Sequence, residues 1–213
     1  MAAMWLVTLS DFVQMMENQG QHLERRYPYF AVVLYSAMNG LEGQLHEYIT
    51  SHWSALNALT GDNCLMMALA DSPAAKVEDF IPGDVYQIAR LLGVDVASLP
   101  CVVFFTEPSQ RADTLVLSLP QFFDSAEDAT DEQLTKWFRT LQSIVDGCVA
   151  QDSSNRLTCL RNGIDDQFPS DADRMAGVKQ FGKLAVPSMT TAATVLQALA
   201  TIVPIVAKMA GGG

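Results

Sequence analysis

Two kinds of hydrophobic pattern alternate along the first two thirds of the chain. The runs at residues 29–36 and 64–71 are continuous and apolar, which is typical of strands buried on both faces of a sheet. Between them, apolar residues recur at spacings of three and four, which predicts a helix over residues 41–59 with the inner face Leu41, Leu45, Tyr48, Ile49, Trp53, Leu56 and Leu59. The order strand, helix, strand predicts a parallel crossover.

The pattern changes after residue 94. Two strand-like runs, residues 101–107 and 114–120, are separated by a polar stretch, which predicts an antiparallel hairpin. Residues 131–145 then read as a helix whose inner face is Leu134, Trp137, Phe138, Leu141 and Ile144 or Val145. With a short run at residues 4–9 and helices expected at 11–25 and 82–94, the order is β-α-β-α-β-α-β-β-α. This order predicts an α/β protein with a mixed central sheet flanked by helices.

Composition narrows the functions that this chain can have. The 213 residues are 49% hydrophobic, enough for one substantial core with an extension. The 24 acidic and 13 basic residues give a net charge of −11, which repels phosphates and argues against nucleic-acid binding.

Cysteines 64, 101, 148 and 159 lack the spacing of a zinc site or disulfide framework, so we expect buried, reduced thiols and no metal or cofactor. No secretory signal is visible, and the expected location is cytoplasmic.

Two stretches, LYSAMNGLEGQL at residues 34–45 and ASLPCVVFFTE at residues 97–107, resemble landmarks of the thioredoxin family. The resemblance covers roughly residues 4–148. In that family a buried strand runs into a turn bearing Cys-Gly-Pro-Cys, and the next helix begins there. Here Asn39, Gly40, Leu41 and Glu42 stand in that place. The resemblance also implies that Pro100 is a cis-proline and that the backbone of Leu99 faces a bound peptide or thiol ligand.

Replacement of both sulfurs argues against thiol chemistry at this turn. Disulfide exchange needs a thiolate that attacks and a second sulfur that resolves the mixed disulfide, and Asn39 and Glu42 supply neither. Asn39 suits a helix N-cap, and Glu42 three residues later suits the reciprocal position of a capping box. We expect Cys101 to point into the core. His46 and His52 lie six residues apart on different helix faces, so they predict no metal pair.

The last third of the chain has a different character. Residues 149–183 are polar and rich in turn formers, which predicts a linker with room for one short helix. Residues 184–207 carry no charge and form an amphipathic pattern in which the apolar stripe is Val195, Leu196, Leu199, Ile202, Val203 and Val206. The opposite stripe is Thr190, Thr194, Gln197 and Thr201. This C-terminal helix, within residues 184–213, could pack on the preceding unit, dock on a partner or a second copy, or enter a membrane.

Together these patterns predict a non-catalytic binding or assembly module that acts through protein–protein contacts. Residues 1–148 would form a thioredoxin-like domain, residues 149–183 a linker and residues 184–213 the helix. The expected contact surfaces are Met38 to Glu42, the backbone beside Leu99 and Pro100, and the apolar stripe. One rival hypothesis is a membrane-active effector that inserts residues 184–207 into a bilayer. A weaker rival is a redox enzyme that uses Cys101 alone.

Overall fold

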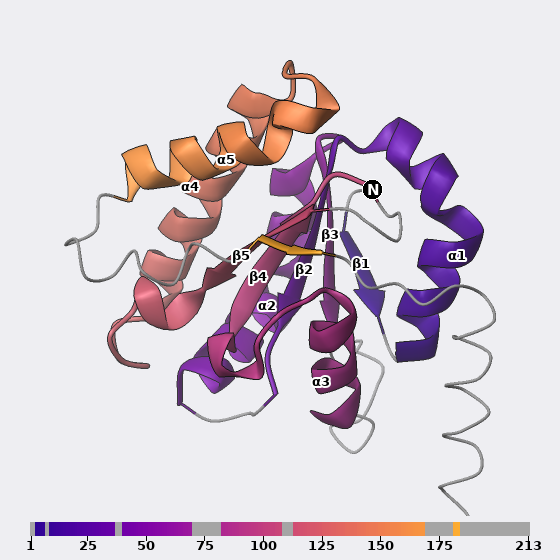
Figure 1. Ribbon diagram of the computed structural model, residues 1–213. Helices are drawn as coiled ribbons and strands as arrows, with labels where there is room; N and C mark the ends of the chain where they lie inside the picture. Colours follow the sequence, from indigo (N-terminus) through magenta and orange to yellow (C-terminus); the bar gives the residue numbers. More distant parts are fainter. Residues whose placement is uncertain are drawn as a thin grey trace, which may run out of the picture.

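The computed structural model describes residues 3–6, 9–36, 40–69, 82–107, 113–168 and 181–183. Within these residues, six strands form one sheet in the order β1-β3-β2-β4-β5-β6 (Figure 1). The strands are β1 (Ala3–Leu6), β2 (Tyr29–Leu34), β3 (Cys64–Leu69), β4 (Cys101–Phe105), β5 (Asp113–Ser118) and β6 (Phe181–Lys183).

Strand directions make the sheet mixed. Strands β1 and β2 both run parallel to β3, whereas β4 runs antiparallel to β2 and to β5. All six side chains of β2 are buried, as its uninterrupted apolar sequence predicts for a central strand. The parallel crossover, the hairpin of β4 and β5, and the α/β class with a mixed sheet are therefore confirmed.

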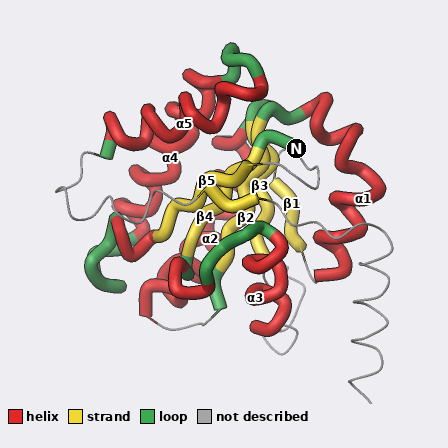
Figure 2. The backbone as a smooth tube through the Cα atoms, viewed as in Figure 1, coloured by secondary structure: helices red, strands yellow, loops and turns green. Residues whose placement is uncertain are grey.

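Helices cover both faces of this sheet (Figure 2). They are α1 (Leu9–Arg26), α2 (Gly40–Thr60), α3 (Pro82–Leu91), α4 (Asp131–Cys148) and α5 (Ser153–Gln167). Side chains alternate along β2, so Ala31 and Val33 join the cluster with α2, α4 and α5. Phe30 and Val32 join the opposite cluster with α1 and α3.

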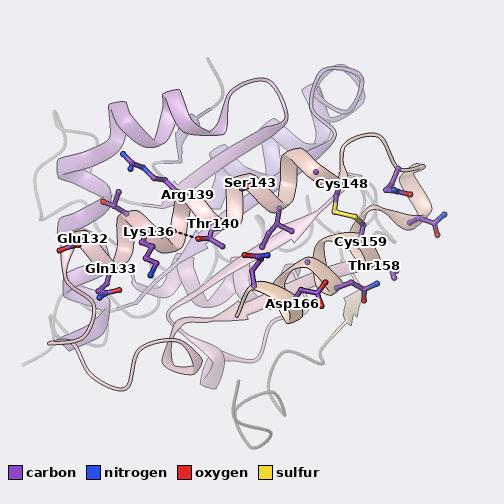
Figure 3. A pocket seen from close by; sticks show the side chains of 18 of the residues that line it. Glu132, Gln133, Lys136, Arg139, Thr140, Ser143, Cys148, Thr158, Cys159 and Asp166 are labelled. Atoms are coloured by element: carbon purple, nitrogen blue, oxygen red, sulfur yellow. Dashed lines mark hydrogen bonds between the residues drawn. A yellow bond between two sulfur atoms is a disulfide. The ribbon is translucent and has the colours of Figure 1, made fainter. Parts of the chain in front are cut away.

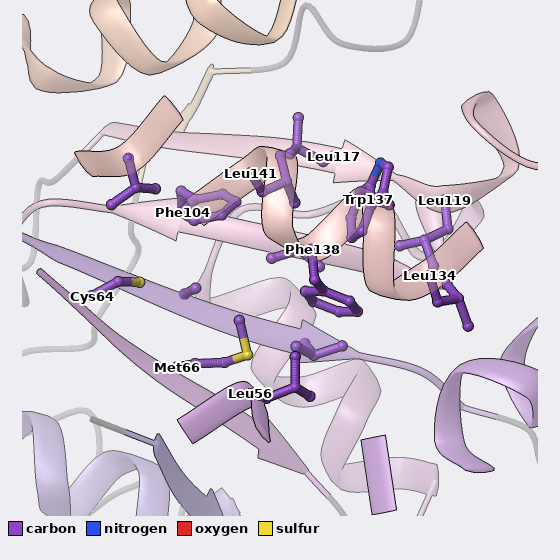
Figure 4. Close-up of a cluster of buried hydrophobic side chains, with 14 of the residues drawn as sticks. Leu56, Cys64, Met66, Phe104, Leu117, Leu119, Leu134, Trp137, Phe138 and Leu141 are labelled. Carbon is purple, nitrogen blue, oxygen red and sulfur yellow. The ribbon is translucent and has the colours of Figure 1, made fainter. Parts of the chain in front are cut away.

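Helix α4 supplies much of the first cluster (Figure 4), in which Trp137 lies beside Leu119 and the Phe138 ring stacks on Tyr48 of α2. The inner face predicted for residues 131–145 is confirmed, and both Ile144 and Val145 are buried. The helix begins where predicted because the Thr130 hydroxyl accepts a hydrogen bond from the Gln133 amide at 3.4 Å.

The segment expected to be a linker contains two elements of the fold. Helix α5 spans 15 residues and buries Leu157, Leu160 and Ile164 against the cluster that includes α4. Strand β6 pairs antiparallel with β5, with Lys183 opposite Asp113. The three apolar residues of α5 are spaced by three and four, but polar residues surround them and conceal the stripe. Residues 153–167 therefore extend the packed unit beyond residue 148.

The expectation of four reduced thiols is wrong for two of them. Cys148 and Cys159 form a disulfide that joins the last residue of α4 to α5. The bond forms because α5 folds back along α4 and brings two cysteines of sequence separation 11 together. Cys64 and Cys101 are free and buried, as expected.

None of the helices in the described part of the chain is long and apolar enough to cross a membrane. The expected C-terminal helix, including Val195, Leu196, Leu199, Ile202, Val203 and Val206, lies outside the described residues.

Candidate functional site

The turn at the predicted site connects β2 to α2. The chain passes through Tyr35 and Ser36 after β2, and α2 begins at Gly40. Gly40 has a φ of 54°, and a side chain there would meet no neighbouring atom within 4 Å. The backbone conformation, rather than crowding, therefore favours glycine at this position. Met38 and Asn39, and with them the predicted Asn39 cap, lie outside the described residues.

Glu42 ties the first turn of α2 to the end of β2. Its Oε2 accepts a hydrogen bond from the Ser36 amide and another from the Ser36 hydroxyl at 3.2 Å. The same hydroxyl lies 3.4 Å from Oε1. The carboxylate thus has a backbone partner, as the capping-box prediction required, but this partner is Ser36, three residues before the expected cap. Charge-assisted bonds of this kind fix the orientation of the turn.

The second predicted landmark lies beside this turn. The Leu99–Pro100 peptide is cis, which confirms the prediction. Because Leu34 pairs with Cys101 across β2 and β4, this peptide lies near the end of β2. The Leu99 amide already donates to the Val96 carbonyl at 3.2 Å. A ligand at this position would therefore meet the carbonyl or the half-buried side chain of Leu99, not a free amide.

Cys101 follows the cis peptide and points into the core. Its side chain is fully buried in the cluster with α1 and α3, as predicted. Burial raises the pKa of the Cys101 thiol to about 12, and the nearby negative charge of Glu42 adds to the rise. At neutral pH this sulfur is protonated and inaccessible, so it cannot act as an attacking thiolate.

The histidines of α2 make separate local contacts. His46 Nδ1 lies 3.2 Å from the Tyr35 hydroxyl, and His52 Nδ1 donates to the Tyr48 carbonyl at 3.1 Å. His52 Nε2 lies 3.7 Å from Asp131 at the start of α4. No group of three metal-ligating side chains occurs among the described residues. The two histidines therefore connect neighbouring elements and do not face a common site.

Sequence reasoning missed a groove between α4 and α5 (Figure 3). It has a volume of about 1310 Å³ and is open to solvent. Its lining combines uncharged polar residues, among them Thr140, Ser143 and Asn155, with charged residues of both signs, among them Arg139 and Asp166. Both sulfurs of the disulfide belong to lining residues. Only the packing of α5 against α4 creates this groove, and the linker interpretation of residues 149–183 concealed it.

Comparisons with protein-family models, curated proteins and solved structures found no match for this chain. What the site can do is therefore inferred from its own geometry. Glu42, Leu99, Pro100 and Cys101 are brought together by β2 and β4, with Gly40 and Leu41 in the same first turn as Glu42.

The buried Cys101 thiol predicts a loss of stability in alkali. Its ordinary pKa of 9.0 applies to the unfolded chain, and the folded pKa is about 12, so the folded state binds more protons between these values. The stabilisation is complete below pH 9 and declines as the pH rises toward 12. Thermal melts between pH 8 and 11 should show a falling Tm, with a shallower fall for Cys101→Ala. An equal slope in both proteins would contradict this assignment.

Proposed function

We propose that this protein is a non-catalytic module of thioredoxin-like fold that acts through protein–protein contacts. Support for the fold comes from the element order, the strand arrangement and a cis-proline beside the turn that leads into α2. The observation that carries the function is the position of Glu42. Its carboxylate, held by Ser36, occupies the turn where the resemblance places redox sulfurs, and the neighbouring Cys101 thiol is buried.

This arrangement suits binding better than catalysis. A disulfide-exchanging turn must present a thiolate to its substrate, whereas the described part of this turn presents a carboxylate already engaged by Ser36. Gly40 is exposed, and Leu41 and Leu99 are half-buried. A small surface with an apolar rim and a fixed carboxylate can receive a protein segment without chemical change. In this proposal the module acts in the cytoplasm and does not bind nucleic acid.

The C-terminal stripe is the proposed surface for self-association. The net charge of −11 makes two copies repel each other, but residues 184–207 carry no charged side chain. Electrostatic repulsion between copies is therefore smallest where these segments meet. Burial of Leu199, Ile202 and their apolar neighbours against the same stripe of a second copy would supply the favourable free energy.

Two full-length double variants test this surface. Leu199→Asp with Ile202→Asp places two charges on the apolar stripe, and Thr194→Asp with Thr201→Asp places the same charge on the hydroxyl face. By size-exclusion chromatography with light scattering, we expect wild-type protein and the threonine variant to form oligomers that dissociate on dilution. The Leu199/Ile202 variant should be monomeric, with a nearly unchanged Tm.

Four results would contradict the proposal. If the wild-type protein is monomeric, it does not self-associate. If the Leu199/Ile202 variant unfolds, the stripe packs on the folded unit instead. Wild-type protein that floats with anionic liposomes and releases an enclosed dye would favour the membrane-active effector. Reduction of insulin that disappears in Cys101→Ser would favour the single-cysteine enzyme instead.

A further inference from the structure

Helix α5 has little stability of its own. Its N-cap residue Asp152 makes no side-chain hydrogen bond to the first turn, which contains no acidic residue. The last turn contains Asp165 and Asp166 and no basic residue, so charge opposes the helix dipole at that end. The sequence SSNRLTCLRNGIDDQ also contains many weak helix formers. The position of α5 therefore depends on contacts with the rest of the protein.

A small number of contacts hold α5 against the rest of the protein. Besides its three buried aliphatic residues, the Tyr29 hydroxyl donates to the Arg156 carbonyl at 3.0 Å near the start of the helix. At the end, the Phe168 ring lies 5.2 Å from that of Phe122. Between these ends, the Cys148–Cys159 disulfide is the covalent connection to α4. Apart from the backbone between Cys148 and Ser153, this crosslink is the covalent bond that holds the middle of α5 on α4, so the position of the helix is sensitive to its state.

The disulfide is accessible from solvent on one side. It lies along the open groove between α4 and α5, where Figure 3 shows both sulfurs near the groove wall. Cys148 is only 3% exposed, whereas Cys159 is half-buried. An incoming thiolate would therefore attack the Cys159 sulfur. Cys64 and Cys101, by contrast, are enclosed by the two core clusters.

We propose that the Cys148–Cys159 disulfide is a redox-controlled tether that holds α5 on α4 and is opened by dithiol reductants. A thiolate of the dithiol attacks Cys159 Sγ, the disulfide bond breaks, and Cys148 leaves as a thiolate that takes up a proton. The second thiol of the reductant then attacks the mixed disulfide and releases Cys159, which is also protonated. Two electrons pass to the protein, and the reductant ends as a disulfide.

Opening the tether changes the surface of the protein. The apolar side of α5, with Leu157, Leu160 and Ile164, separates from α4 and uncovers part of the core cluster beneath it. Glutathione and thioredoxin systems keep cytosolic thiols reduced, whereas oxidising compartments preserve disulfides. The tether would therefore be open in the expected cytoplasmic location and closed under oxidising conditions. This inference does not rest on the proposed binding function.

The test begins with the oxidised full-length protein in native buffer. We expect dithiothreitol followed by N-ethylmaleimide to add two labels by intact-mass analysis, at Cys148 and Cys159. Cys64 and Cys101 act as internal controls and should stay unlabelled. No labelling without denaturant would refute accessibility, and four labels would show that reduction requires global unfolding.

Hydrogen exchange measures the effect on the helix. After reduction, α5 amides should exchange at least about tenfold faster because local opening is no longer limited by the covalent bond. Peptides from α1 and α3, which pack in the opposite core cluster, should be unchanged. If two labels are added but α5 exchanges no faster, the disulfide does not control the position of α5, and the proposal is overturned.

Variants isolate the tether from other effects of the reductant. Cys148→Ser with Cys159→Ser should give fast α5 exchange without dithiothreitol and no response to it. The matched control Cys101→Ala keeps the disulfide and should respond as wild type does. If the double variant does not fold, reduced wild-type protein still provides the decisive comparison, because its sequence is unchanged.

Discussion

Replacing Trp137 with alanine is expected to lower the free energy of unfolding by about 3–5 kcal/mol. Trp137 is 3% exposed, and its ring packs edge-to-face against Phe122, Phe123 and Phe138 at centroid distances of 5.5, 6.3 and 5.0 Å. Alanine would remove these contacts and leave a cavity between α4 and the segment after β5. Urea unfolding followed by far-ultraviolet circular dichroism measures the change.

Trp137→Phe is the matched control for this substitution. The indole Nε1 is buried and has no hydrogen-bond partner among the described residues, so phenylalanine would break no hydrogen bond. It also keeps an aromatic ring against the neighbouring phenylalanines. We therefore expect a clearly smaller loss of stability than with alanine. Equal losses would mean that the single aromatic ring kept by phenylalanine does not preserve the packing of the indole, which would contradict this expectation.

The sequence predicted the central fold because its signals are local and strong. The continuous apolar run of β2 and the stripe of α2 each specify an element without knowledge of its neighbours. Gly61 ends α2 with a φ of 55°, a conformation that glycine adopts readily. The hairpin of β4 and β5 follows from two apolar runs and a short polar connection.

Helix α5 and its disulfide were missed for a physical reason. Leu157, Leu160 and Ile164 cover one edge of an existing core, so α5 needs only a narrow apolar stripe, and the rest of its surface faces solvent. This composition resembles that of a linker. The pairing of Cys148 with Cys159 then depends on the return of α5 along α4, which the spacing of the cysteines does not reveal.

At the candidate site, the sequence likewise predicted the local features but not the contacts that depend on the folded shape. The helix start near Gly40 and the cis-proline follow from motifs, but the contact of Glu42 with Ser36 depends on the shape of the turn. The occupied amide of Leu99 depends on the short helix before it. These two contacts limit what the site can bind, because the Glu42 carboxylate and the Leu99 amide already have hydrogen-bond partners within the protein.

Gly163 and Gly147 provide a matched pair that tests how closely α4 and α5 pack. An alanine Cβ at Gly163 would lie 2.4 Å from Ile144 Cγ2, whereas one at Gly147 would meet nothing within 4 Å. Overpacking costs about 1–3 kcal/mol, and alanine in a helix gains up to about 1 kcal/mol over glycine. We therefore expect Gly163→Ala to lower the free energy of unfolding and Gly147→Ala to raise it slightly.

A double-mutant cycle with Ile144→Ala identifies the cause of this difference. Removing Cγ2 makes room for the new Cβ, so Gly163→Ala should cost less in the Ile144→Ala background than in wild type. Gly147→Ala should have the same effect in both backgrounds, because no side chain lies near it. Chemical unfolding of the oxidised proteins gives all four differences. If Gly163→Ala is as harmless as Gly147→Ala, α5 does not approach α4 this closely, and the groove between them has a different shape.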